Sequence, residues 1–239
     1  MNMGNAFEQF FKRGNKGYPK FKKKGQKDSF RIPVACQIDY DNWEIKIAKI
    51  GPVKFFKGHN KQIEGTIKSY TITHTNTDRY FISVVYEKVD RPKLNNSKSV
   101  GIDVGIKSFA TLSDGTVFEN QKHLKSNLRK LRVLQRTVSR RYQQGKKREE
   151  QSNNWKKAVR RVAKLHEKIA FQRHDYLHKV STWIAENYST VCVETLNVQG
   201  MMKNHHLAQA ISDCGWSMFL NMLEYKCDSL VKIDKWFAS

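Results

Sequence analysis

The stretch Ser99–Glu119 reads SVGIDVGIKSFATLSDGTVFE, and its pattern decides the fold of the C-terminal part of the chain. Val100–Val104 is an apolar run that predicts a buried strand, and Lys107–Leu112 predicts its antiparallel neighbour. Asp114-Gly115 is a two-residue hairpin signal that leads into a third strand. This part of the chain therefore begins with three consecutive strands.

Two long helices are predicted after these strands. Apolar residues recur at helical spacing in two segments, and each segment has one apolar face. The segment QQGKKREEQSNN, residues 143–154, separates them and contains the breaker residue glycine. Together they predict an antiparallel helical hairpin over residues 122–187.

Further alternation of strand and helix follows the hairpin. Val191–Thr195 predicts a buried strand, two helices broken near Cys214-Gly215 come next, and Val231–Ile233 predicts a last strand. The order of elements predicts a mixed sheet with helices on its faces, and this α/β domain spans residues 100–239.

The N-terminal part has a different pattern. Residues 28–90 contain short alternating runs rich in β-branched and aromatic residues, separated by turn signals. Several such strands at close spacing indicate a small antiparallel β-barrel or a sandwich. We expect a short helix at residues 5–13 with a basic arm up to residue 27, and the polar segment 91–99 predicts an interdomain linker.

The charge of the chain indicates a nucleic-acid partner. The chain has 44 Lys and Arg against 22 Asp and Glu, a formal charge of +22. Such an excess attracts polyanions, of which nucleic acid is the commonest. Residues 122–179 hold 19 basic and four acidic residues, so the hairpin carries most of the excess. A solvated basic surface is the alternative.

The predicted phosphate contacts lie on the hairpin and on the basic arm, where aromatic residues are interleaved with lysines. They are Arg129, Arg132, Arg136, Arg140, Arg141, Lys156, Lys157, Arg160, Arg161, Lys164 and Arg173 on the hairpin, and Lys20, Lys22, Lys23 and Lys24 on the arm.

Several classes of protein are disfavoured. No segment approaches the roughly 18 to 20 apolar residues of a membrane span, and the N-terminus lacks the apolar region of a secretory signal. The four cysteines form no C-x-x-C pair, which disfavours a disulfide scaffold and a zinc site within this chain. We expect a cytoplasmic, nucleoid-associated protein with no membrane contact and no small-molecule substrate.

Asp103 and Glu194 are the candidates for metal-dependent chemistry. An ionised carboxylate inside an apolar strand is costly unless it is paired or binds a metal, and Gly101 and Gly105 beside Asp103 leave room for a ligand. Glu194 ends the second apolar strand. Two such acids suit Mg²⁺ or Mn²⁺ in a two-metal phosphodiesterase. For each acid, a salt-bridged position at a strand end is the alternative.

Six segments, in order along the chain, together resemble the TnpB (OrfB) family of insertion-sequence transposases. They are GIDVGIKSFATLSDG (101–115), KLHEKIAFQRHDYLHKVS (164–181), VETLNVQGM (193–201), KNHHLAQAISDCGW (203–216), LEYKCDSL (223–230) and KIDKWFAS (232–239). The resemblance implies an RNA-guided DNA endonuclease with a RuvC-type, RNase H-like core. Its first catalytic aspartate would be Asp103 and its catalytic glutamate Glu194. It also implies a guide RNA and a target DNA as partners, with residues 28–89 as the wedge domain that grips the guide.

The sequence departs from the family pattern at both ends. Family members have a longer N-terminal region, and after the last motif they continue into a zinc element and a third catalytic aspartate. We therefore expect a piece truncated at both ends, with an incomplete RuvC-type domain that holds Mg²⁺ or Mn²⁺ weakly or not at all, and that binds nucleic acid without appreciable cleavage. Asp213, Asp228 and Asp234 are the nearby carboxylates, and Asp213 and Asp228 are expected on surface helix ends. The alternative is a catalytically inactive DNA- or RNA-binding regulator or a pseudogene remnant.

Overall fold

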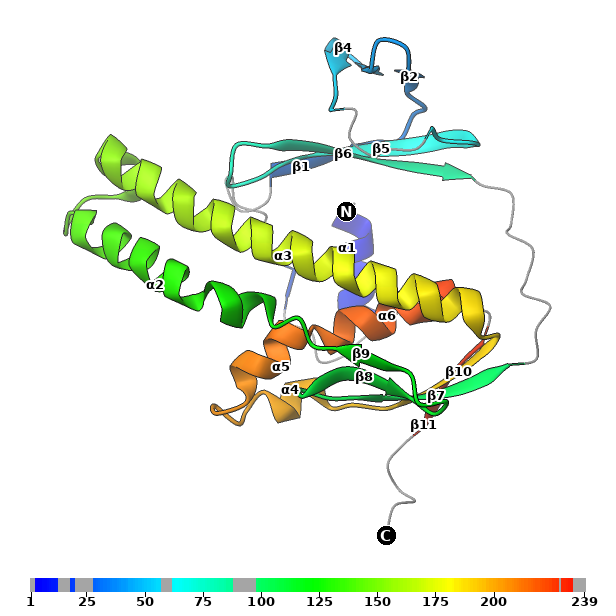
Figure 1. The fold of residues 1–239 in the computed structure, drawn as a ribbon. Helices are drawn as coiled ribbons and strands as arrows, with labels where there is room; N and C mark the ends of the chain where they lie inside the picture. The colour runs from blue at the N-terminus through cyan, green and yellow to red at the C-terminus, as the bar shows by residue number, and fades with distance from the viewer. Residues whose placement is uncertain are drawn as a thin grey trace. The chain divides into compact units, whose positions relative to one another are not determined.

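A computed structural model describes residues 3–12, 18–19, 28–56, 62–87, 98–227 and 229–233 of the chain. The chain divides into two compact units, residues 1–89 and 90–239. Each unit has a hydrophobic core of its own. Figure 1 shows the helices and strands of the chain. The predicted basic arm and the predicted linker fall largely outside the described residues.

In its described residues, the N-terminal unit has one helix and six strands. The helix α1 spans Met3–Lys12 and overlaps residues 5–13, where the sequence predicts a short helix. The strands form two three-stranded antiparallel sheets, with the orders β1-β5-β6 and β2-β3-β4. Their bounds are β1 Asp28–Ile32, β2 Gln37–Asp39, β3 Glu44–Ile47, β4 Gly51–Lys54, β5 Thr66–His74 and β6 Tyr80–Glu87.

The predicted closed barrel is wrong for the residues that the structure describes. Two open sheets share one core, in which Ile45 and Ile47 of β3 pack with Tyr70 and Ile72 of β5. The hydroxyl of Tyr70 also accepts a hydrogen bond from the backbone N–H of Ala48 at 3.0 Å. The strands of the small sheet have only three or four residues, whereas β5 has nine. The small sheet can pack on the long one but is too short to close a barrel with it, so the sandwich alternative describes the unit better.

The C-terminal unit is built on a five-stranded mixed sheet with the order β11-β10-β7-β8-β9. β7, β8 and β9 pair antiparallel, whereas β10 and β11 run parallel to β7. This arrangement confirms the predicted mixed sheet. The bounds of the strands are β7 Ser99–Val104, β8 Ser108–Leu112, β9 Val117–Glu119, β10 Thr190–Glu194 and β11 Ser229–Ile233.

The predicted helical hairpin is confirmed by α2 and α3, which pack together through Leu131, Leu165 and Ile169. α3 has 35 residues and is capped by Ser152, whose hydroxyl accepts a hydrogen bond from Trp155 N at 3.2 Å. No helix in the described part of the chain is long and apolar enough to cross a membrane. The helices are α2 His123–Arg141, α3 Asn153–Asn187, α4 Val198–Met201, α5 Ala208–Cys214 and α6 Trp216–Lys226, with a 3₁₀ turn at Arg148–Glu150.

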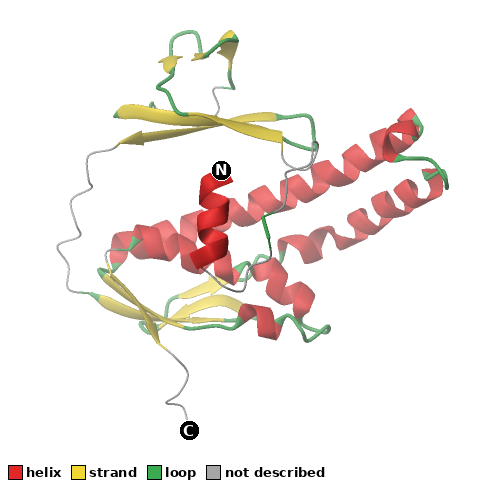
Figure 2. Ribbon diagram, turned by 180° about the vertical axis from the view of Figure 1, so that it is seen from behind, coloured by secondary structure: helices red, strands yellow, loops and turns green. Residues whose placement is uncertain are grey.

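The C-terminal part of α3, together with α6, covers one face of the five-stranded sheet, as seen from both sides in Figures 1 and 2. Leu177 of α3 and Phe219 of α6 are completely buried and belong to the same core as Val100, Ile102 and Val191 of the sheet. Because side chains alternate along a strand, the residues between these core positions point to the opposite face.

Gly215 separates α5 from α6, as the sequence predicts. Its φ of +71° is a left-handed conformation that glycine adopts at little cost. A Cβ atom at this position would lie 3.1 Å from Cδ of Arg173 and 3.3 Å from Cδ1 of Leu177. Both the backbone conformation and the close approach of α3 therefore require glycine here.

Candidate functional site

The structure places Asp103 and Glu194 on adjacent parallel strands. β7 and β10 pair with Ile102 opposite Val193, so the next residues, Asp103 and Glu194, fall at the same level at the carboxyl ends of the two strands. Neighbouring strands lie about 4.8 Å apart. Ile102 and Val193 face the core, so both acids point to the other face of the sheet. The sheet thus brings together two acids that are 91 positions apart in the sequence.

The burial of the two acids differs from the expectation. Asp103 is exposed, and only alternate residues of β7 are buried. The argument that Asp103 needs a partner because it is buried is therefore wrong. Glu194 is half-buried, and its Oε1 atom is inaccessible to solvent. Exposure leaves Asp103 accessible to an ion and to a phosphate from solution.

The two glycines beside Asp103 have different roles. A Cβ atom at Gly101 would meet only the side chain of Ser113, at an ordinary contact distance of 3.7 Å. At Gly105 it would lie 3.0 Å from the carbonyl oxygen of Ser108. Gly105 is therefore required by the close turn between β7 and β8.

Among the described residues, no group of three or more His, Cys, Asp or Glu side chains lies close enough together to hold a metal ion. The Asp103–Glu194 pair remains the candidate set. Its chemistry fits magnesium, which proteins often bind through one or two carboxylates, with water and substrate phosphate as the other ligands. The metal role of the pair stays a prediction.

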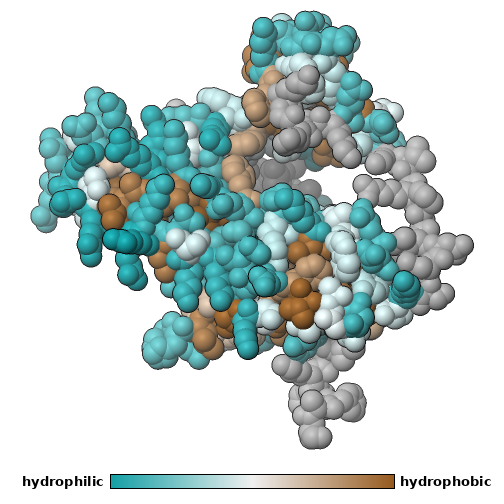
Figure 3. Space-filling model, in the orientation of Figure 1, coloured by the Kyte–Doolittle hydropathy of each residue, from teal (hydrophilic) through white to brown (hydrophobic). Residues whose placement is uncertain are grey.

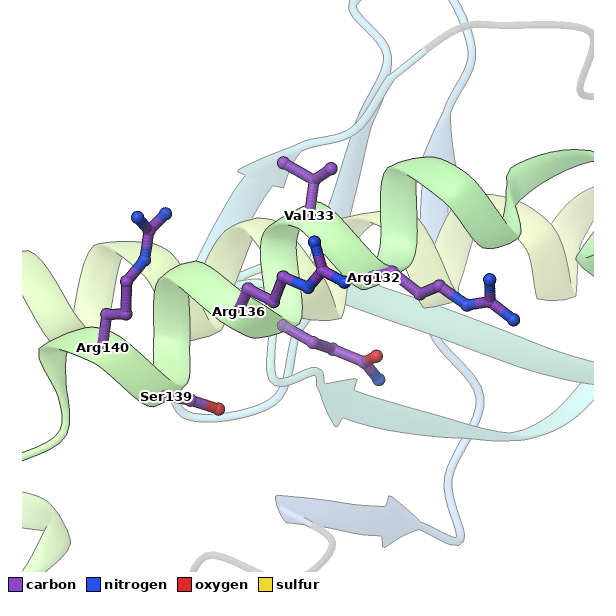
Figure 4. Close-up of a pocket in the computed structure, with 6 residues that line it drawn as sticks. Arg132, Val133, Arg136, Ser139 and Arg140 are labelled. Atoms are coloured by element: carbon purple, nitrogen blue, oxygen red, sulfur yellow. The ribbon is translucent and has the colours of Figure 1, made fainter.

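The predicted phosphate contacts on the hairpin are exposed, with the exception of Arg173. Arg132, Arg136 and Arg140 follow one another at four-residue spacing, which is about 6 Å along a helix. They line a shallow groove of about 580 Å³ on the surface of α2 (Figure 4). Hydrophilic residues cover most of the visible surface of the hairpin (Figure 3). This surface is accessible along both helices.

Arg173 is partly buried and forms an ion pair within the protein. Its Nη2 atom lies 3.0 Å from Oδ1 of Asp213, and the side chain of Asp213 is only 6% exposed. The expected position of Asp213 on the surface is therefore wrong. A helix end has an exposed and a buried side, and the sequence does not show which side faces α3.

Asp213 also caps the start of α2. Its carboxylate accepts hydrogen bonds from the backbone N–H groups of Leu124, at 2.9 and 3.0 Å, and of Lys125, at 3.2 Å. The cap position of α2, Lys122, provides no side-chain hydrogen bond of its own. Burial lowers the pKa of the neighbouring His123, an effect that the Asp213 carboxylate opposes. Asp213 thus joins α5, α2 and α3, a role that sequence reasoning missed.

A half-buried charge, Lys226, was also missed by sequence reasoning. Nζ of Lys226 donates hydrogen bonds to the carbonyl oxygen of His178 at 3.0 Å and to the hydroxyl oxygens of Ser181 and Thr182 at 2.8 and 2.7 Å. Desolvation, followed by the charge of Lys226, lowers the pKa of His178. Lys226 ends α6, where a basic residue suits the helix dipole, but that signal does not reveal its partners.

Some predicted residues cannot be placed. Lys20, Lys22, Lys23 and Lys24 lie outside the described residues, and so do Asp228 and Asp234. Their predicted roles stay predictions.

Comparisons with known proteins agree on one family. The OrfB_IS605 family model, described as "Probable transposase", matches residues 82–205, which is more than half of the chain. The chain is 34% identical to the "Putative RNA-guided DNA endonuclease InsQ" of Escherichia coli over 92% of the chain and 56% of that protein. It is 35% identical to the "Putative RNA-guided DNA endonuclease" of Streptomyces pristinaespiralis over 98% of the chain and 58% of that protein.

A structural comparison gives a weaker likeness. A chain of a CRISPR-Cas12f ternary complex matches with a TM-score of 0.37 and 14% identity, over 95% of this chain and 57% of that one. The chain spans just over half the length of the two curated relatives. On the family match and the identities, the chain belongs to the OrfB (TnpB) family of transposases, as its ordered motifs predict.

Proposed function

We propose that this chain carries the nucleic-acid-binding and metal-binding core of a transposon-associated, RNA-guided DNA endonuclease. The observation that carries the proposal is the pairing of β7 with β10, which places Asp103 and Glu194 at one level on one face of the sheet. The names of the relatives support the reaction, since they are described as RNA-guided DNA endonucleases.

The sheet topology supports an RNase H-like, RuvC-type core. Three antiparallel strands come first in the sequence. β10 then joins the first of them in parallel, and β11 joins β10 in parallel, each after a helical segment. In this assignment β7 is the central strand and contributes Asp103. We assign the N-terminal unit, with its two small sheets, to the guide RNA.

The two carboxylates would hold Mg²⁺ or Mn²⁺ through their oxygen atoms. When bound, such an ion supplies an activated water and stabilises the charge that develops on a phosphate. The two carboxylates would position the ion and the phosphate. Asp103 is accessible from solvent, while Glu194 is held by its half-buried place at the end of β10. The exposed arginines of the hairpin bind the phosphate backbone, which orients the strand but reads no bases.

The first test of the proposed function measures metal binding, and the second measures cleavage. Electron paramagnetic resonance of Mn²⁺ added to the chain with nucleic acid should show a bound ion in the wild type. The bound signal should be lost in Asp103→Asn and in Glu194→Gln, because each removes a charged oxygen ligand. Glu186→Gln, an exposed acid on α3, is the matched control and should keep the signal.

Cleavage is the second readout. Guide RNA and matched DNA are incubated with Mg²⁺ or Mn²⁺ and each variant. The sequence predicts no appreciable cleavage by this chain, so guide-dependent cleavage that Asp103→Asn abolishes would overturn that prediction. Retention of the full Mn²⁺ signal by both Asp103→Asn and Glu194→Gln would refute the metal assignment.

A further inference from the structure

A pocket lies at the edge of the five-stranded sheet where the carboxyl ends of β7, β9 and β10 meet. It has a volume of about 610 Å³, within the range of sites that hold small organic groups. Ile106 and Lys107 contribute from the turn after β7, Lys122 and Lys125 from the start of α2, and Leu207 precedes α5. Figure 1 shows these elements.

The strand directions explain why these segments meet. β7 and β10 are parallel, and β9 points the same way because it is antiparallel to β8. The connections that leave these three strands therefore emerge at one edge. In open α/β sheets, ligands bind in the crevice outside the carboxyl ends of the strands. Asp103 and Glu194 lie at this same edge.

The chemistry of the pocket has two parts. Three exposed lysines, Lys107, Lys122 and Lys125, stand at its rim. Aliphatic side chains line it as well: Ile106, Leu128, Leu207 and Ala210. Cations beside an apolar surface complement a group that is anionic at one end and flat and apolar at the other. A nucleotide has that composition, with phosphate for the lysines and a base face for the aliphatic surface.

The carboxylate of Asp213, which also lines the pocket, does not oppose an anion strongly. It is almost completely buried, and its charge is balanced by Arg173 and by the two N–H groups at the start of α2. Three lysines at the rim therefore leave the pocket electropositive.

The pocket is preformed by hydrogen bonds behind its wall. Nδ2 of Asn120 donates to the carbonyl oxygen of Ile106 at 2.8 Å, and its Oδ1 accepts from Lys122 N at 3.0 Å. These bonds tie the turn after β7 to the start of α2. Lys122 is held at a φ of +49°, which non-glycine residues rarely adopt and which surrounding contacts must enforce. Tyr176 donates to the carbonyl oxygen of Glu119, and burial raises the pKa of Tyr176 to about 12, so it stays a donor at neutral pH.

We infer that this pocket binds one nucleotide of a single nucleic-acid strand, with the base against the aliphatic wall and a phosphate on the lysines. The inference deepens the proposed function and rests on it, because the strand is the one presented to Asp103 and Glu194. The hairpin binds backbone only, whereas this pocket distinguishes a strand with bases from a strand without them.

The test compares two short strands that have the same phosphates. One is a thymidine oligonucleotide, and the other is an abasic oligonucleotide of equal length. Fluorescence anisotropy gives a Kd for each, and the readout is the ratio of the abasic Kd to the thymidine Kd. We expect a ratio of about tenfold for the wild-type chain, because the abasic strand has no base to bury against the aliphatic wall.

Two pocket variants should reduce this ratio. Ala210→Gln fills the pocket with a side chain that suits a helix. Leu207→Ser removes apolar surface at a residue that is already 45% exposed, so little buried apolar area is lost. The matched control, Lys146→Gln with Lys147→Gln, removes charge from the hairpin loop outside the pocket. It should weaken both strands equally and keep the wild-type ratio.

The outcomes separate this inference from the function on which it rests. If both pocket variants keep the wild-type ratio, the inference is overturned, while steep salt dependence of binding would leave the proposed function intact. If the wild-type chain binds neither strand, the inference and the proposed function are both overturned. The last measurement adds free thymidine monophosphate as a competitor of the thymidine strand. Displacement of the strand only at monophosphate concentrations far above that of the strand supports the inference. Competition at equal concentration would identify a site for the free nucleotide instead and overturn it.

Discussion

Replacement of Asp213 should destabilise the C-terminal unit more than any change on the surface of the hairpin. Asp213→Ala removes the side chain that caps α2, and loss of a helix cap costs about 1 kcal/mol. It also leaves the partly buried guanidinium of Arg173 without its counter-charge. Breaking one side of a buried ion pair costs about 3 to 5 kcal/mol. Because Arg173 retains 21% exposure, we expect the total to fall near the lower limit, at about 3 kcal/mol.

Two further variants divide this total into its parts. Asp213→Asn keeps an oxygen that can cap α2, since asparagine caps as well as aspartate, but it removes the charge. It should therefore cost less than Asp213→Ala by about the value of the cap. Adding Arg173→Met to Asp213→Asn removes the uncompensated charge and should recover most of the loss, because a pair replaced by neutral groups is often nearly neutral in stability.

Urea unfolding followed by circular dichroism measures the three variants, and amide hydrogen exchange measures the cap. The amides of Leu124 and Lys125 should exchange faster in Asp213→Ala than in Asp213→Asn. A cost below about 1 kcal/mol for Asp213→Ala, together with unchanged exchange at both amides, would show that Asp213 does not hold the start of α2.

Three other predictions follow from the same contacts and charges. Replacing Arg132, Arg136 and Arg140 of α2 by glutamine should make the slope of log K against log salt for single-stranded nucleic acid shallower by about 2, as measured by fluorescence anisotropy. An unchanged slope would show that these three arginines do not contact phosphates. Gly215→Ala should lower the free energy of unfolding by about 1 to 3 kcal/mol, because alanine is strained at a φ of +71° and its Cβ would crowd Arg173; an unfolding midpoint equal to the wild type would contradict this. The pKa values of His123 and His178 are lowered by folding, so the unfolded state binds protons more readily, and stability should be complete above about pH 6.5 and fall below it. Thermal melts from pH 7.5 to 5 measure this, and His178→Gln should flatten the dependence.

Much of the C-terminal fold could be predicted from local sequence patterns. The alternation in Ser99–Glu119 and the turn at Asp114-Gly115 determine three strands, because a strand has a side-chain period of two and a tight turn needs specific residues. The apolar spacing on α2 and α3 determines the hairpin in the same way, since only a helix places those residues on one face. Gly215 marks the break between α5 and α6 because few other residues adopt its backbone conformation.

The tertiary structure alone decided which of these elements meet. Nothing near Glu194 states that β10 pairs with β7, and that pairing is what brings it level with Asp103. The same is true of Asp213, whose carboxylate caps a helix that begins 90 positions earlier. Three features depend on how all the apolar surfaces of the chain are buried together. They are the pairing of strands, the burial of one side of a helix end and the packing of two sheets on a shared core. A local pattern specifies the period of each element, while the partner of each element is set by long-range packing.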